Sequence, residues 1–167
     1  AMNKGILVAK GKYCQFLNSG DYFVSSDIID KVFKNIPDCS IFYGNMLKLL
    51  QNGKVYRDKC EQGKISMLTL YKGTLNHSPA FIKRSLFEKY GLYDETLKIV
   101  SDWKWYLIAI GVNNEKVKYI NLDITYFNMD GISNTNHRLE IQERRLVLEE
   151  IIPANVLIDY DNYWLNI

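Results

Sequence analysis

Two aspartates, Asp21 and Asp102, lie beside apolar segments where a carboxylate could take part in chemistry. Asp21 closes the turn 18–21 (sequence N-S-G-D), directly after the apolar run 13–17. Open α/β sheets bind ligands in the loops beyond the carboxyl ends of their strands. A carboxylate there can hold Mg²⁺ or Mn²⁺ together with substrate phosphates. An Asp in such a turn can also bond only its own backbone. Asp21 is therefore a candidate metal ligand, with a structural turn role as the alternative.

Asp102 follows Ser101 at the start of a segment whose apolar residues have helical spacing. An acidic residue in the first turn stabilises a helix through the helix dipole. The same position can aim a carboxylate into a cleft, where it would serve as a general base. These two roles are compatible. Trp103 and Trp105 lie on opposite faces of the expected helix, so at most one of them lines a pocket.

His77 lies in the loop 73–79, where a lone histidine is usually solvated or caps a helix. No Ser-His-Asp or Cys-His spacing, glycine-rich phosphate loop or H-E-x-x-H motif accompanies it. The cysteines Cys14, Cys39 and Cys60 form no C-x-x-C pair, which favours reduced thiols over a zinc site or a disulfide framework. The candidate chemistry therefore depends on the two aspartates.

Apolar periodicity and turn formers predict helices that alternate with strands, and hence an α/β fold. We expect helices over 2–10, from 28 to 33, over 79–90, from 101 to 110 and over 136–151, the last with a Glu140 to Arg144 pair. We expect strands over 13–17, 40–43 and 116–127, the last either continuous or divided at 121–123. Between them, 44–72 reads as a hairpin at Asn52-Gly53 followed by a mobile loop.

The composition is that of one globular domain: 167 residues, 47% hydrophobic and 24% charged. The 21 Lys and Arg against 19 Asp and Glu give a net charge of +2, which leaves no broad basic surface and disfavours a nucleic-acid partner. No apolar run approaches the roughly 20 residues of a membrane helix, and no signal peptide opens the chain. We expect a single domain over 1–167 that works in the cytoplasm or at the inner face of its membrane.

Several segments, taken in order, resemble the family 2 glycosyltransferases of bacterial surface-polysaccharide synthesis. The helix 1–11 has the family's A-M-N-K-G-I and A-x-G residues, and 13–21 resembles the strand and acidic metal-binding loop that follow. The segment 77–95, H-x-x-x-F-I-K-R-x-L-F-x-x-Y-G-x-Y-D-E, with 99–103 resembles the acceptor side, which ends in the family's catalytic Asp. The residues 130–133, D-G-I-S, are similar to the family's G-G-I-S. The resemblance covers about the first 135 residues.

The resemblance implies a GT-A fold, a nucleotide-diphosphate sugar donor and inverting transfer to a hydroxyl of a saccharide or lipid-linked acceptor. It implies that Asp21 holds Mg²⁺ or Mn²⁺ at the donor diphosphate, with Asn18 and Ser19 in the same donor-binding loop, and that Asp102 is the base. The substrate-binding residues that it implies are His77, Asp94, Trp103 and Gly131.

The chain departs from the family pattern at two places. The metal loop of the family usually has two acidic residues as D-x-D, whereas Asp21 stands alone here. The family's N-terminal half, which holds the base and ribose of the donor, should precede Ala1. We therefore expect an incomplete GT-A domain, inactive by itself, with an exposed sheet edge that favours homo-oligomers.

Two other classes of protein remain open on the residues alone. The aromatic residues, among them twelve Tyr and three Trp, could serve a non-catalytic carbohydrate-binding or interaction module in which the acidic loops are only turns. A nucleotidyltransferase of related fold would also use an acidic metal loop. It would need a glycine-rich basic loop for its nucleotide, which the sequence does not contain.

Overall fold

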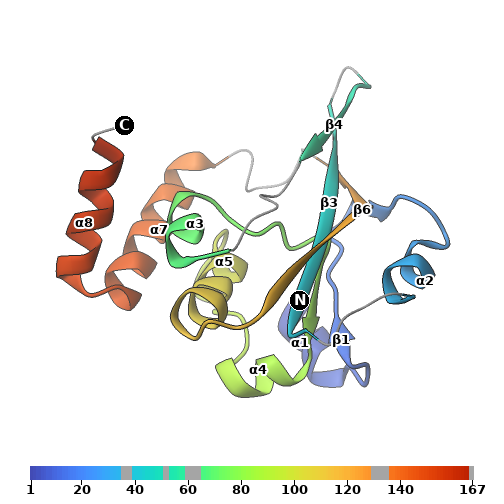
Figure 1. Cartoon of the computed structure of the whole chain (residues 1–167), viewed down its shortest axis with the longest axis horizontal. Helices are drawn as coiled ribbons and strands as arrows, with labels where there is room; N and C mark the ends of the chain where they lie inside the picture. Colours follow the sequence, from blue (N-terminus) through green and yellow to red (C-terminus); the bar gives the residue numbers. More distant parts are fainter. Residues whose placement is uncertain (35–38, 51–52, 59–64, 129–135, 166–167) are drawn as a thin grey trace.

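The structure, a computed structural model, describes residues 1–34, 39–50, 53–58, 65–128 and 136–165 and shows one mixed sheet with helices on both faces (Figure 1). The strands are β1 (Tyr13–Cys14), β2 (Tyr22–Phe23), β3 (Ile41–Leu49), β4 (Val55–Asp58), β5 (Ala80–Lys83) and β6 (Val117–Asn128). The helices are α1 (Met2–Val8), α2 (Ile28–Phe33), α3 (Met67–Lys72), α4 (Ser85–Tyr90), α5 (Ser101–Tyr106), the π-helical η1 (Leu107–Val112), α7 (His137–Ile151) and α8 (Ala154–Leu165). The predicted α/β class, with a mixed central sheet flanked by helices, is confirmed.

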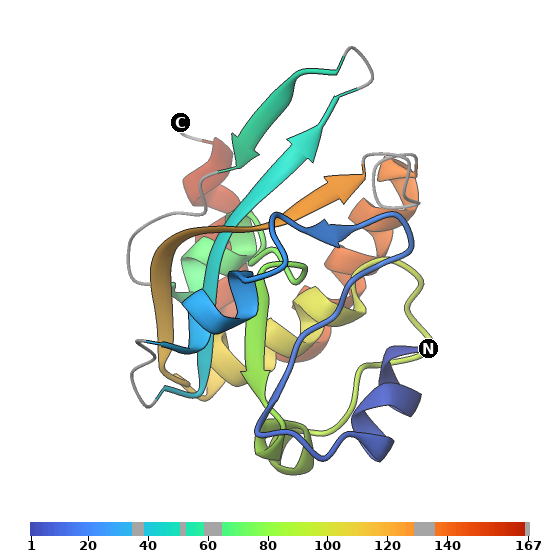
Figure 2. The ribbon, with the colours of Figure 1, turned by 90° about the vertical axis from the view of Figure 1, so that its right-hand side faces the viewer.

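The sheet has the order β1-β5-β3-β6-β2, with β4 paired to the distal half of β3 (Figure 2). β3 and β6 are parallel, whereas the other pairs are antiparallel, so β1, β3 and β6 run in one direction. Their carboxyl ends define the edge at which open α/β sheets bind ligands. The outer strands β1 and β2 contain two residues each. Self-association through a sheet edge stays a prediction.

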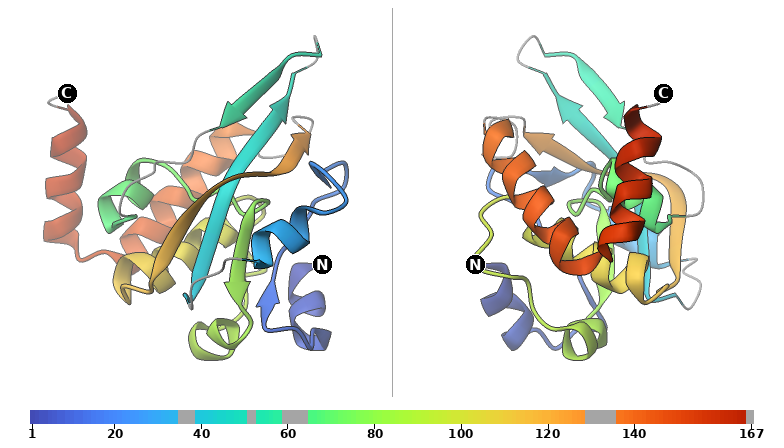
Figure 3. Two further views of the ribbon diagram at one scale, coloured as in Figure 1. Left: turned by 45° about the vertical axis from the view of Figure 1, so that its right-hand side comes forward. Right: turned by 90° about the vertical axis from the view of Figure 1, so that its left-hand side faces the viewer.

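Residues of β3 and β5 alternate between the two faces of the sheet, as pleating requires. Ile41, Tyr43 and Ile82 belong to the main core, which lies against α3, α5, η1 and α7 (Figure 3). Phe42 and Phe81 lie on the other face against α2, with ring centroids 4.8 Å apart. Both faces are therefore covered at the centre of the sheet, which explains why every residue of 41–47 is buried.

A register shift lies in the middle of the long β3–β6 pair. Tyr43 is opposite Tyr119, but two residues further along β3, Asn45 is opposite Asp123. Gly44 lies at the shift, where a Cβ would come within 2.5 Å of a backbone carbonyl oxygen of β6. The strand predicted over 116–127 is thus continuous, and its expected division is a bulge that only glycine accommodates on the neighbouring strand.

The helix predicted over 79–90 is wrong in its first half. Ala80, Phe81 and Ile82 are 1%, 3% and 0% exposed and form β5, which hydrogen-bonds to β3 and β1 on its two sides. A segment buried on both faces has no polar positions that would reveal the period of a strand. The helix begins only at Ser85.

The Asn52-Gly53 hairpin is confirmed by the pairing of β3 with β4, in which Leu49 is opposite Val55. Gly53 has φ +75°, the left-handed conformation that such a turn requires. Asn52 itself and part of the expected mobile loop, 59–64, lie outside the described residues.

Two helices were not predicted. α3 begins with a capping box in which Ser66 and Thr69 bond each other's backbone N–H groups. α8 packs beside it and α7, where the Tyr71 hydroxyl donates to Asp161 at 2.7 Å (Figure 3). α3 has six residues, too few for an apolar period, and α8 has twelve but buries only Leu157 among its described side chains. Within the described ranges, no helix combines the length and apolar character needed to cross a bilayer.

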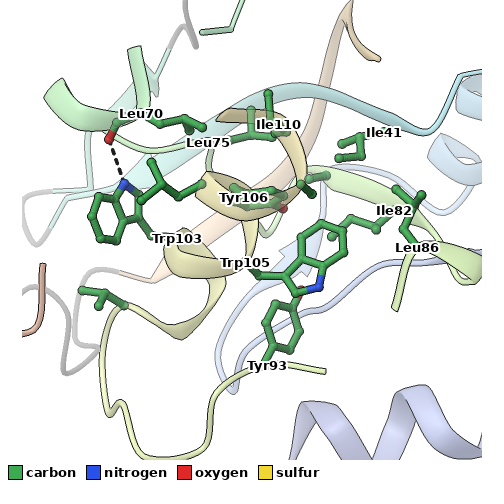
Figure 4. Packing of buried hydrophobic residues seen from close by; sticks show 14 of the residues in the cluster. Ile41, Leu70, Leu75, Ile82, Leu86, Tyr93, Trp103, Trp105, Tyr106 and Ile110 are labelled. Atoms are coloured by element: carbon green, nitrogen blue, oxygen red, sulfur yellow. Dashed lines mark hydrogen bonds between the residues drawn. The ribbon is translucent and has the colours of Figure 1, made fainter. Parts of the chain in front are cut away.

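The two tryptophans of α5 form the centre of the main core (Figure 4). Trp103 and Trp105 are 1% and 2% exposed. Each indole N–H donates to a backbone carbonyl, Trp103 to Leu70 at 2.8 Å and Trp105 to Gly91 at 2.9 Å. The helix α5, which carries Asp102 in its first turn, is thereby fixed by packing and by hydrogen bonds beyond its own backbone.

Candidate active site

The turn 18–21 connects β1 to β2 and is tightly held. The Asp21 N–H donates to the Asn18 carbonyl at 3.0 Å, and the Asn18 N–H donates to Asp21 Oδ2 at 3.3 Å. Asp21 Oδ1 accepts from the N–H of Asn128, the last residue of β6, at 3.0 Å. Gly20 has φ +92°, and a Cβ there would lie 2.9 Å from the Asn128 side chain. The turn role of Asp21 is therefore present, and it places the carboxylate at the carboxyl ends of β1 and β6.

The loop that carries His77 is fastened to two strands. Ser78 is 1% exposed, and its carbonyl accepts from Gln15, next to β1, at 2.6 Å. The Ser78 hydroxyl lies 3.0 Å from that of Thr125 on β6. The His77 carbonyl accepts from the Ala80 N–H at 3.0 Å, where β5 begins. These contacts bring the His77 ring to the same edge of the sheet as the turn 18–21.

The start of α5 is held by a buried carboxylate from a distant helix. Glu143 of α7 is 6% exposed and accepts three backbone N–H groups in succession. They belong to Lys98 at 2.8 Å, Ile99 at 2.9 Å and Val100 at 3.2 Å. One carboxylate accepts all three bonds, and hydrogen bonds to a charged acceptor are stronger than those between neutral groups. The loop before Asp102 is thereby fixed.

Asn18, His77 and Asp102 are connected side chain to side chain. His77 Nδ1 lies 3.1 Å from Asp102 Oδ2, and His77 Nε2 lies 3.1 Å from Asn18 Nδ2. The other oxygen of Asp102 accepts from the Trp103 N–H at 2.8 Å. The His77 and Asp102 side chains are each 18% exposed, so the site is sheltered but reachable. Side chains from two loops and from the first turn of α5, 59 and 25 positions apart along the chain, thus form one polar cluster.

Negative charge determines the protonation of this cluster. Burial lowers the pKa of His77, but the hydrogen bond and charge of Asp102, together with the charge of Asp21, outweigh it and raise the pKa above its usual value. Burial, followed by the charges of Asp102 and Cys14, raises the pKa of Tyr93 well above its usual value. The Tyr93 hydroxyl is buried and has no hydrogen-bond partner among the described residues. The charge of Asp102 therefore acts on both His77 and Tyr93, and the Tyr93 phenol stays neutral.

The structure leaves the other predicted site residues outside this cluster. Asp94 pairs with Lys104 at 2.9 Å, and hydrogen bonds from Thr96 and Lys104 lower the pKa of Asp94 to about 2. Trp103 is enclosed in the core, with the Arg144 guanidinium 4.5 Å from its ring centroid. Ser19 is exposed in the turn 18–21. Gly131 lies outside the described residues.

The described part of the chain contains no group of three or more His, Cys, Asp or Glu side chains that could hold a metal ion. Asp21 offers a carboxylate whose two oxygens each accept one backbone hydrogen bond, which leaves lone pairs on both. Such a donor set fits a hard cation that is shared with phosphate oxygens, and does not fit one that the chain holds by itself.

Glu143 and Tyr93 were missed from the sequence. Glu143 shares a face of α7 with Val147, four residues on, and both are buried. A carboxylate in the apolar stripe of a helix was therefore a usable signal of a buried role. Its partners, 43 to 45 residues away, could not be identified from spacing.

The fold is one seen in a solved bacterial protein. The structure resembles that of S. aureus TarS 1-349, with a TM-score of 0.62 and 16% identity, over 91% of this chain and 44% of that chain. TarS 1-349 in complex with UDP gives a TM-score of 0.57 and 17% identity over 75% of this chain and 38% of that chain.

In sequence, the chain is similar to PGL/p-HBAD biosynthesis glycosyltransferases of Mycobacterium bovis (strain BCG / Pasteur 1173P2) and Mycobacterium tuberculosis (strain ATCC 25618 / H37Rv). The identity is 23% over 139 residues, which are 81% of this chain and 52% of either relative. The chain thus spans about half the length of the curated relatives it matches. No family model matches it.

Proposed function

We propose that the chain is part of an inverting glycosyltransferase of the GT-A type, which moves a sugar from a nucleotide-diphosphate donor to a hydroxyl of a saccharide or lipid-linked acceptor in polysaccharide synthesis. The observation that carries the proposal is the cluster that joins the turn 18–21 to Asp102 at the carboxyl edge of the sheet. The names of the sequence relatives support the reaction class. The complex of TarS with UDP supports the nucleotide class.

Asp102 is the base in this proposal. Each of its oxygens accepts one hydrogen bond from the protein, so a lone pair remains for an incoming hydroxyl. Asp102 takes the hydroxyl proton as the acceptor oxygen forms a bond to the anomeric carbon. The bond from that carbon to the diphosphate oxygen breaks, and its electron pair leaves with the nucleotide diphosphate. One displacement with one base inverts the configuration of the anomeric carbon.

The turn 18–21 is the donor-side loop in this proposal. Asp21 would hold Mg²⁺ or Mn²⁺ at the donor diphosphate, and Asn18 and Ser19 belong to the same turn. The bound cation would neutralise the charge that develops on the leaving nucleotide. Asp94 and Trp103 are not part of the proposal, because Lys104 and the core engage their side chains.

The test measures donor binding and transfer separately. It uses the protein at the full length of its natural reading frame, because the match covers 52% of the relatives. Calorimetry is run with UDP and a panel of nucleotide sugars, with and without Mn²⁺, and transfer is followed by release of the nucleotide diphosphate. We expect Asp102→Asn to lower transfer about 10³-fold while donor affinity stays within about two-fold. We expect Asp21→Ala to abolish the tightening of UDP binding by Mn²⁺.

The matched control is Asp159→Asn, which changes an exposed aspartate of α8 and leaves the site intact. Full transfer by Asp102→Asn would remove Asp102 as the base. Unchanged Mn²⁺ dependence in Asp21→Ala would remove Asp21 as the metal ligand. Heat with sugars alone and none with any nucleotide would favour the non-catalytic carbohydrate-binding module.

A further inference from the structure

We infer that His77 is a positioning residue that orients the carboxylate of Asp102 and connects it to the donor-side turn 18–21. This inference rests on the proposed function, in which Asp102 is the base. The first step is the orientation of Asp102. Its two oxygens bond to different donors, the Trp103 N–H at 2.8 Å and His77 Nδ1 at 3.1 Å. Two fixed donors on two oxygens leave the carboxylate plane little freedom to rotate. The remaining lone pairs therefore keep a constant direction.

The second step is that His77 is itself held in place. Its second ring nitrogen contacts Asn18 Nδ2 at 3.1 Å, so the ring is fixed at both ends. Its backbone is held through the next residue, Ser78. The Ser78 carbonyl accepts from the Gln15 side chain at 2.6 Å, and the Ser78 hydroxyl lies 3.0 Å from that of Thr125 on β6. Because His77 is held in place, the carboxylate that bonds to it is held in place too. Misplacement of a reacting group by about 1 Å can lower the rate about 100-fold.

The third step is the direction of the two hydrogen bonds. A neutral ring with its proton on Nδ1 donates to Asp102 and accepts from the Asn18 amide through Nε2. One tautomer therefore satisfies both neighbours. The amide of Asn18 belongs to the turn that carries Asp21, so a shift of that turn on donor binding reaches Asp102 through His77. The base is thereby aligned with the donor side of the site.

His137, the second histidine of the chain, lacks the contacts that hold His77 in place. His137 begins α7, its side chain is 74% exposed, and it lies 3.6 Å from Glu140 of the same helix. His77 differs by its burial and by its two side-chain partners, one in the turn 18–21 and one in the first turn of α5. His137→Asn is therefore the matched control for substitutions at His77.

The test separates the two ring nitrogens by substitution in the full-length protein. An Asn amide places its donor near the position of Nδ1, whereas a Gln amide reaches the position of Nε2. We expect His77→Ala to lower kcat about 100-fold with the donor KM within about two-fold. We expect His77→Asn to recover kcat to within about five-fold of the wild type, and His77→Gln to stay near the alanine value. ¹⁵N NMR of the wild-type ring should show the proton of the neutral form on Nδ1, and Asp102→Asn should alter that signature.

The outcomes distinguish this inference from the proposed function. Wild-type protein that neither binds UDP nor transfers sugar would overturn both. A wild-type enzyme that transfers sugar, with His77→Ala as active as His137→Asn, would overturn only the role of His77. Equal loss in His77→Asn and His77→Ala, although the bond to Asp102 is retained, would mean that His77 acts by its own proton and not by positioning. Recovery by Gln in place of Asn would place the important contact at Asn18.

Discussion

Glu143 and Asp102 are acidic side chains at the same junction, yet their surroundings differ. Glu143 is 6% exposed and accepts only backbone N–H groups, three of them from the loop 98–100. Asp102 is 18% exposed and shares one oxygen with a titratable side chain, His77. A carboxylate saturated by backbone donors holds a loop in place. A carboxylate paired with an ionisable group and partly open to solvent is available for proton transfer.

The largest stability effect is expected from Glu143→Ala. The substitution leaves three N–H groups of the loop 98–100 without their acceptor, and the N–H of Val100 is buried. We expect the free energy of unfolding to fall by about 3 kcal/mol. Urea denaturation followed by tryptophan fluorescence measures it.

Glu140→Ala is the control for this substitution. Glu140 lies on the same helix, is 27% exposed and pairs with Arg144 at 3.1 Å. We expect it to cost about 0.5 kcal/mol. Equal losses for the two glutamates would show that the backbone contacts of Glu143 contribute nothing special, and the contrast with Asp102 would fail.

Local patterns in the sequence predicted two of the segments that carry the cluster, but no contact between its side chains. The turn at 18–21 follows from its Asn, Ser and Gly residues, and an Asp at the start of an apolar helix has a recognisable position. The resemblance added His77 as a substrate-binding residue. Its contact with Asp102 was not predicted, because it depends on how β5 places the loop 73–79 beside α5.

The errors in the fold arise where burial removes the periodic signal. α7 was predicted correctly, including the pair of Glu140 with Arg144, because one face of the helix is polar. The prediction of helix for 80–83 is wrong because both faces of that segment are covered and its apolar run has no period. α3 depends on a capping box that starts at Ser66, a signal that is weak in the sequence because Thr69 stands where Glu or Gln is usual.

A smaller effect on stability is expected from Trp103→Phe, which tests whether the residue beside Asp102 belongs to the core. The substitution removes the indole N–H that donates to Leu70 and leaves a buried carbonyl unpaired. It also weakens the contact with Arg144 at 4.5 Å from the ring. We expect a loss of about 2 kcal/mol in unfolding free energy, with donor and acceptor KM unchanged.

Trp105→Phe is the partner experiment, because Trp105 is 2% exposed and its indole donates to the Gly91 carbonyl. The two variants should lose similar stability. A raised KM in Trp103→Phe, with the KM of Trp105→Phe unchanged, would show that Trp103 contacts a substrate. Trp103 would then belong to the site as well as to the core.

The smallest effect is expected at Glu115, a third carboxylate, whose donors are side chains. Its Oε1 accepts from Lys89 Nζ at 2.9 Å and from the Tyr90 hydroxyl at 2.6 Å. Burial raises the pKa of Glu115, but hydrogen bonds from Lys89, Tyr90 and Ser40 outweigh it and lower the pKa from 4.5 to about 2. A depressed pKa in the folded state stabilises the protein above the unfolded pKa, and this contribution is lost as the pH falls from about 4.5 to about 2.

Glu115→Gln should therefore destabilise the protein at pH 7 by about 1 kcal/mol, a small value because the Lys89 side chain is 60% exposed. The difference from the wild type should shrink as the pH is lowered through 4 toward 2. Urea unfolding at pH 7, 5 and 3 measures it. A difference that stays constant with pH would mean that the contact acts by shape and not by charge. Glu115 would then resemble a neutral hydrogen-bond acceptor, and the distinction among the three carboxylates would depend on burial alone.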